Sequence, residues 1–202
     1  MSVEFPHYYL ADSFPFGLTY GHWTVMWWRW ALSIPKPINP VMDKTGTHSS
    51  IGQPEKLVWF LCGGFGTEAT SLPERSCTVP TGRSILFPVI NYEANPLEYP
   101  ELVTEGDLLE NVRNIENTIA RKECIVDGRH IEAQRVESDP KIFELELVKN
   151  GPLEKTGHTL AAADGYWIFL KPLDPGDHFI TFEGSCERGK LRAGATYSVH
   201  ID

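Results

Sequence analysis

A histidine near the start of a tryptophan-rich segment is the first candidate for acid–base chemistry. His22 lies between two apolar faces of this segment and is followed seven residues later by Arg29, a spacing that places both on one polar strip of a helix. Imidazole titrates near neutral pH without help from its surroundings, so His22 could transfer protons. Its partner would be a loop carboxylate, for which the candidates are Asp43, Glu93 and Asp164. The simpler alternative for each carboxylate is a turn or surface charge.

Aromatic residues close to His22 could form the walls of a binding pocket. Tyr20, Trp23 and Trp28 lie in the same segment, and Arg29 would add a polar contact. Aromatic walls suit flat apolar ligands, sugar faces and cations. The sequence therefore predicts recognition of a small, partly apolar molecule, with the loop 36–54 closing the pocket. The competing interpretation is that the tryptophans only fill a core.

Other kinds of chemistry have weaker support. The histidines show no metal-binding spacing, and a nucleophile elbow of the G-x-S-x-G type is absent from the sequence. Gly63 and Gly64 follow an apolar stretch, but neither a helix nor a Gly-Lys-Ser follows them. We expect no metal and no cofactor. The enzyme alternative is thus a cofactor-independent cyclase, isomerase or lyase that uses His22 with one of the carboxylates.

Two helices are predicted, at about 20–34 and 104–121. In the first, Thr19 is suited to the N-cap and Pro35 ends the helix. One stripe of this helix holds Trp23, Met26, Trp27, Trp30 and Ile34, and the far side holds Val25, Trp28 and Leu32. In the second, Thr104 and Asp107 form a variant capping box. Its apolar stripe is Leu108, Val112, Ile115 and Ile119.

The rest of the chain is predicted to be strands and turns. Apolar or alternating stretches recur at 57–61, 76–80, 83–91, 123–126, 130–136, 141–148, 166–170, 178–182 and 195–201. Asp127-Gly128 favours a tight hairpin turn, and Pro88 favours an edge strand or a bulge. Strands at this spacing, mostly antiparallel, predict a mainly β fold, a single β-sandwich or jelly-roll-like domain with two inserted helices.

Residues 1–18 are predicted to form an extended aromatic arm, and residues 19–202 the β-sandwich-like domain. The arm is rich in aromatic residues and proline, which favours an extended segment over a helix. Such an arm could add to the sheet edge of a neighbouring copy. A structural or self-associating module, and hence a homo-oligomer, is therefore a third functional alternative.

Composition narrows the list of partners. The chain has 202 residues, a net charge of −9 and a pI near 5.3. Basic residues are scattered, so a nucleic-acid partner is not expected, and the apolar runs are too short for membrane insertion. The N-terminal residues lack the features of a leader, which predicts a cytoplasmic protein, or a secreted one if a leader has been removed. Reduced cysteines are expected, with a Cys62–Cys77 disulfide as the alternative in an oxidising compartment.

Several stretches together resemble a family of hypothetical bacterial and archaeal proteins, many of them secreted. They are SFPFGLTYGHWTVMWWRWALSIP with NPVMDKTG, VWFLCGGFG, CTVPTGRSILFPVIN and ADGYWIFLKPLDPGDHFITFEG. The resemblance covers most of the chain. It implies a common fold and supplies no chemistry.

Overall fold

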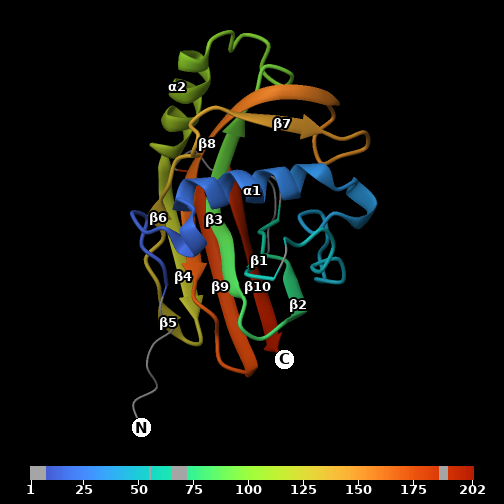
Figure 1. The fold of residues 1–202 in the computed structure, drawn as a ribbon, viewed down its shortest axis with the longest axis vertical. Helices are drawn as coiled ribbons and strands as arrows, with labels where there is room; N and C mark the ends of the chain where they lie inside the picture. Colours follow the sequence, from blue (N-terminus) through green and yellow to red (C-terminus); the bar gives the residue numbers. More distant parts are fainter. Residues whose placement is uncertain (1–7, 55, 65–71, 187–190) are drawn as a thin grey trace.

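The computed structural model consists of two β-sheets packed face to face, with one helix across the outer face of the first sheet (Figure 1). The structure describes residues 8–54, 56–64, 72–186 and 191–202. The fold is mainly β with two α-helices, which confirms the predicted β-sandwich. The jelly-roll alternative is not confirmed, because each sheet contains a parallel pair, β1 with β3 and β2 with β10.

The first sheet has the order β1-β3-β8-β6, and β7 pairs with the beginning of β8. The second has the order β2-β10-β9-β4-β5. The strands of the first sheet are β1 (Val58–Phe60), β3 (Ser84–Ala94), β6 (Gln134–Arg135), β7 (Phe143–Leu147) and β8 (Gly157–Leu170). Those of the second are β2 (Glu74–Val79), β4 (Ile119–Val126), β5 (Arg129–His130), β9 (Gly176–Cys186) and β10 (Arg192–Ile201).

Alternate side chains along the strands of the first sheet pack into two different hydrophobic cores. Successive side chains of a strand point to opposite faces. In β8, Trp167 and Phe169 pack toward α1, whereas Ile168 and Leu170 pack between the sheets. This is why the central strand reads as continuously apolar: both of its faces are covered.

Helix α1 (Tyr20–Ser33) is buried on nearly all sides. Thr19 caps its N-terminus, accepting from the His22 amide as predicted, and Ile34 leaves the helical conformation just before Pro35. The helix lies between the outer face of the first sheet and β7, and short 3-10 turns at Pro15–Gly17 and Lys36–Ile38 flank it. Both its apolar stripes are therefore used, which accounts for four tryptophans within eight residues.

Strand β3 contains a bulge at its proline. It lies centrally, between β1 and β8, and its register shifts between Pro88 and Ile90. Proline cannot donate to the ladder, so a central strand can accommodate it only where pairing is locally interrupted. The bulge alternative is confirmed, and the edge alternative is wrong.

The second helix is shorter than predicted. Helix α2 (Glu105–Glu116) has the Thr104–Asp107 capping box, but it ends at Glu116 instead of near residue 121. The chain turns here, and Ile119, assigned to the helix stripe from its spacing, begins β4. Apolar spacing alone could not distinguish a fourth helical turn from the start of a strand.

The described part of the N-terminal arm contacts its own chain. Tyr8 forms a β-bridge with Leu170, and the Tyr9 amide donates to the Phe169 carbonyl at 2.8 Å. The Tyr9 ring lies 4.9 Å from that of Phe169. Residues 1–7 lie outside the described part, and the addition of the arm to the sheet edge of a neighbouring copy stays a prediction. In the described ranges, no helix combines the length and apolarity needed to cross a membrane.

Candidate functional site

A cavity of about 240 Å³ lies where α1, the bulged end of β3 and the start of β10 meet. Its walls are mostly apolar and aromatic. They are formed by Trp27, Trp28, Val41, Gly63, Gly64, Pro88, Asn91, Tyr92, Glu93, Glu98, Tyr99, Leu153, Leu191, Arg192 and Ala193. Enclosed, largely apolar sites with a few polar groups are the usual form of small-molecule sites.

The β3 bulge places the polar residues of this wall. Beyond the bulge Ile90 packs toward β9, where a Cβ on Gly184 would lie 2.4 Å from the Ile90 Cβ. Asn91 and Glu93 alternate with Ile90 and line the cavity. Asn91 faces Gly165 of β8, where a Cβ would lie 2.6 Å from the Asn91 Cβ. Gly165 of β8 and Gly184 of β9, in the facing sheet, thus leave room for β3 to continue past its proline.

Two carboxyl groups meet at one end of the cavity. The Asn95 amide nitrogen donates to both Glu93 oxygens at 3.1 and 3.3 Å and to Glu98 Oε2 at 2.9 Å. The Asn95 carbonyl oxygen accepts from the backbone amides of Leu97 and Glu98, so the loop after β3 is fixed around this side chain. Burial, with the neighbouring charge and hydrogen bond of Glu98, raises the pKa of Glu93 well above its ordinary value.

Two tyrosines extend the aromatic wall beside the carboxyls. The rings of Tyr92 and Tyr99 lie 6.3 Å apart. Burial, together with the hydrogen bond and charge of Tyr99, raises the pKa of Tyr92, which therefore stays a neutral phenol. On the opposite side, Trp27 and Trp28 make an edge-to-face pair with centroids 5.1 Å apart.

Two N–H donors on the cavity wall have no hydrogen-bond partner in the described part of the chain. They are Trp28 Nε1 and Asn91 Nδ2, and the Trp28 side chain is only 3% exposed. Its neighbour differs, since Trp27 Nε1 donates to the Leu61 carbonyl at 2.8 Å. Buried donors are nearly always paired, so an unpaired donor on a cavity wall leaves a position at which a ligand could supply the acceptor.

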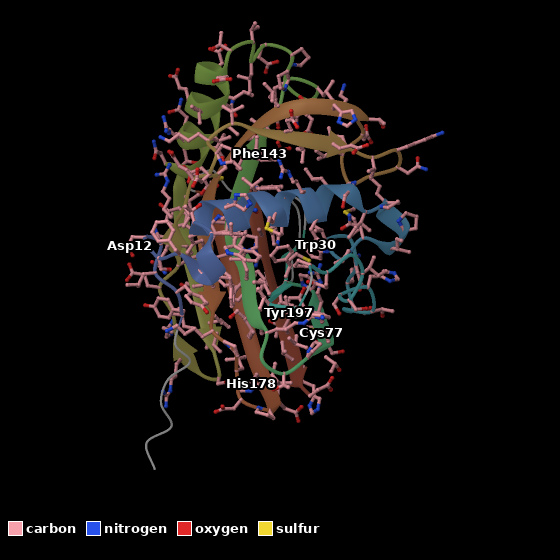
Figure 2. All side chains as sticks on the ribbon, viewed as in Figure 1. Asp12, Trp30, Cys77, Phe143, His178 and Tyr197 are labelled. Carbon is pink, nitrogen blue, oxygen red and sulfur yellow. The ribbon has the colours of Figure 1, made fainter. Side chains whose placement is uncertain are left out.

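A buried arginine holds another wall of the cavity in place. Arg75, 4% exposed, donates to the carbonyls of Cys62, Gly63 (3.4 Å) and Val41 (3.2 Å). It also donates to the Tyr197 hydroxyl at 2.9 Å, and that hydroxyl donates to the Cys62 carbonyl at 2.9 Å (Figure 2 marks Tyr197). Because Val41 and Gly63 both line the cavity, Arg75 positions its wall without belonging to it.

The structure brings two of the predicted site residues together and leaves the others elsewhere. Trp28 and Glu93 line the cavity. Tyr20 is fully buried in the core around α1, and Trp23 Nε1 donates to the Pro15 carbonyl at 2.9 Å. Neither Tyr20 nor Trp23 belongs to the cavity lining.

The polar strip of α1 lies off the cavity as well. His22 is half-buried in the first helical turn, and Arg29 is exposed, with Nε donating to the Glu144 carbonyl at 3.1 Å. Neither side chain is part of the cavity lining. The two lie on the helix face that does not reach the cavity.

Asp43 and Asp164 have structural partners. Burial opposes ionisation of Asp43, but hydrogen bonds from His48 and Thr45 outweigh it and lower the pKa of this carboxyl. Asp164 is buried and forms an ion pair with Arg135 at 2.6 Å.

In the ranges that the structure describes, no group of three or more His, Cys, Asp or Glu side chains is placed to hold a metal ion. Cys62 and Cys77 do not form a disulfide with each other.

Sequence reasoning missed Glu98, Asn95 and Tyr99. A signal for them exists in the stretch NYEANPLEY, where an Asn-Pro turn separates two glutamates and two tyrosines. Asparagine before proline favours a turn, and a turn brings residues on either side of it together.

Comparisons with known proteins add little to this geometry. No family model and no curated protein matches the sequence. Among solved structures, "Solution Structure of Amebosin" aligns over 63% of this chain and 89% of that chain, at 9% identity and a TM-score of 0.22. A TM-score this low carries no argument about fold or function.

Proposed function

We propose that the protein binds a small, partly apolar molecule in the cavity between α1, β3 and β10. The observation that carries the proposal is the Trp28 indole: a buried N–H on the wall of an aromatic cavity, without a partner among the described residues. In a packed core such a donor costs about 1–3 kcal/mol. A bound acceptor would remove that cost, and the four aromatic rings would supply apolar contact.

Native mass spectrometry of the protein purified from its own host tests this function directly. We expect a retained molecule of defined mass. The cavity-filling variant Ala193→Leu should lose it, because Ala193 lines the cavity. Ala120→Leu is the matched control, since Ala120 is an exposed residue of β4. Retention in both variants would place the molecule elsewhere, and a protein that retains and takes up nothing would contradict the proposal.

A second candidate is acid–base catalysis in the same cavity, without a cofactor. It is favoured by Glu93, whose raised pKa suits a general acid and whose neighbour Glu98 could accept the proton. An isomerase, lyase or cyclase needs no more than such a pair and a shaped cavity. This assignment takes the acid–base role from His22 to Glu93. Glu93→Gln should then abolish turnover of the retained molecule and leave its binding intact, and undiminished turnover would exclude the role.

A further inference from the structure

The two carboxyls on the cavity wall have no ion-pair partner among the residues that the structure describes. Glu93 is 6% exposed, and both it and Glu98 accept from the same amide nitrogen of Asn95. Two carboxyls held this close repel each other when both are ionised, so a cation beside them is favoured. The pair therefore presents acceptor oxygens that suit a positively charged donor.

No basic side chain in the described ranges forms an ion pair with either carboxyl. The ion pairs among the described residues join other groups, and Arg192, the one basic residue in the described part of the cavity wall, pairs with Glu183 at 2.8 Å. The hydrogen bonds to Glu93 come from the neutral amide of Asn95. A buried charge is normally compensated, because its desolvation is costly. This one lies on a cavity wall, where a ligand can compensate it.

The rings around the carboxyls favour the same kind of partner. Tyr92 and Tyr99 lie beside the carboxyls, and Trp27 and Trp28 complete the wall. The faces of aromatic rings attract cations, tryptophan most strongly. An anion would meet both the carboxyl charge and the electron-rich ring faces, and it is disfavoured on both counts.

The unpaired donors require a second group on the ligand. Trp28 Nε1 and Asn91 Nδ2 can only donate, so their partner is an acceptor such as a hydroxyl or carbonyl oxygen. The cavity volume of about 240 Å³ suits a small molecule.

We propose that the ligand of this cavity is a small amine that is protonated in the bound state and carries an oxygen acceptor. The ammonium group contacts the Glu93–Glu98 pair and the aromatic faces, and the oxygen accepts from Trp28 and Asn91. This inference rests on the proposed function and specifies its ligand class.

Matched sets of small molecules test the ligand class. Tyramine, tyrosol and 4-hydroxyphenylacetate share a ring and a phenol oxygen but end in an ammonium, a hydroxyl and a carboxylate. They should be titrated by calorimetry alongside aliphatic and heteroaromatic sets built in the same way. We expect the amine of at least one set to bind at least tenfold more tightly than its alcohol and its carboxylate.

Glu98→Gln supplies the decisive variant, because it removes the charge and keeps the shape. The preference for the amine should fall at least tenfold, since charge-assisted hydrogen bonds are about twice as strong as neutral ones. Glu101→Gln removes an equal charge from an exposed position in the same loop and should change nothing. A melting curve of each variant checks that it is folded.

The outcomes separate this inference from the proposed function. Alcohols or carboxylates that bind as well as the amines would overturn the amine assignment and leave the cavity as a binding site. An amine preference that survives Glu98→Gln would place the cation elsewhere and would also overturn the assignment. Failure of every set to bind would count against both proposals.

Discussion

Two buried polar clusters adjoin the cavity. They differ in whether this chain supplies the hydrogen-bond and charge partners of their side chains. The Arg75 guanidinium donates to three backbone carbonyls and the Tyr197 hydroxyl, all of them groups of this chain. Among the described residues, the Glu93–Glu98 pair receives hydrogen bonds from Asn95 but no cation, and the Trp28 indole N–H has no acceptor. The first cluster fixes loops in place, although Arg75 Nε has no hydrogen-bond partner among the described residues, whereas the second leaves polar groups on the wall of the cavity.

The second cluster is evidence for a ligand because its polar groups line a cavity. Glu116 of α2 also has two buried oxygens without a partner in the described part of the chain, and burial, with the charge of Asp164, raises its pKa. Glu116 does not belong to the cavity lining. An unpaired group alone is therefore no evidence for a ligand, since it can simply stay protonated in a packed interface. The argument for binding needs the unpaired group and the cavity together.

The largest expected effect on stability comes from removing the Arg75 guanidinium. Arg75→Met leaves the carbonyls of Cys62, Gly63 and Val41 without their donor, at about 1–3 kcal/mol for each group that stays dry. We expect the free energy of unfolding in urea to fall by about 3 kcal/mol.

The control for this variant is Arg83→Met. Arg83 is half-buried over the Trp59 ring, and within the described ranges its side chain donates only to the Pro54 carbonyl, at 3.4 Å. It should cost less than about 1 kcal/mol. Equal losses for Arg75 and Arg83 would show that the Arg75 cluster is not a structural element of the cavity wall.

The sequence predicts the layers of this fold better than its site. Apolar periodicity and capping residues locate both helices and most strands, because these signals are local. The core position of Trp23 and the cavity position of Trp28 depend on which strands lie over each face of α1. The Glu93–Glu98 pair depends on a turn at Asn95 and on the bulge at Pro88. Such details arise from contacts distant in sequence, which spacing alone does not encode.

The carboxyl pair should make stability depend on pH with a definite sign. The pKa of Glu93 is raised in the folded state, and an unfolded glutamate titrates near 4.3. Below about pH 4 both states are protonated and nothing is lost. As the pH rises the unfolded state ionises first, so this group destabilises the fold progressively from about pH 4.3 upward.

Glu93→Gln should remove this cost. The variant should gain stability relative to the wild type as the pH rises from 4 to 8, because glutamine has no ionisation to suppress in the folded state. Urea unfolding at the two pH values measures the difference, with the exposed Glu101→Gln as control. A relative loss of stability at pH 8 would mean that Glu93 is ionised in the fold and paired with a cation.

The smallest effect compares two tryptophans of the same helix. Trp28 and Trp30 are both buried, but Trp30 Nε1 donates to the Ile51 carbonyl at 2.9 Å, whereas Trp28 Nε1 has no partner among the described residues. Replacement by phenylalanine removes similar apolar volume from each. Trp30→Phe also removes the hydrogen bond to the Ile51 carbonyl and leaves that carbonyl without a donor. It should therefore lower the free energy of unfolding by about 1 kcal/mol more than Trp28→Phe. Urea unfolding of the ligand-free variants measures this difference.

Trp28→Phe should instead weaken binding of whichever probe occupies the cavity, by about 1 kcal/mol. Equal costs for the two variants, with no change in binding, would mean that the Trp28 indole has a partner within the protein and that its N–H does not serve a ligand.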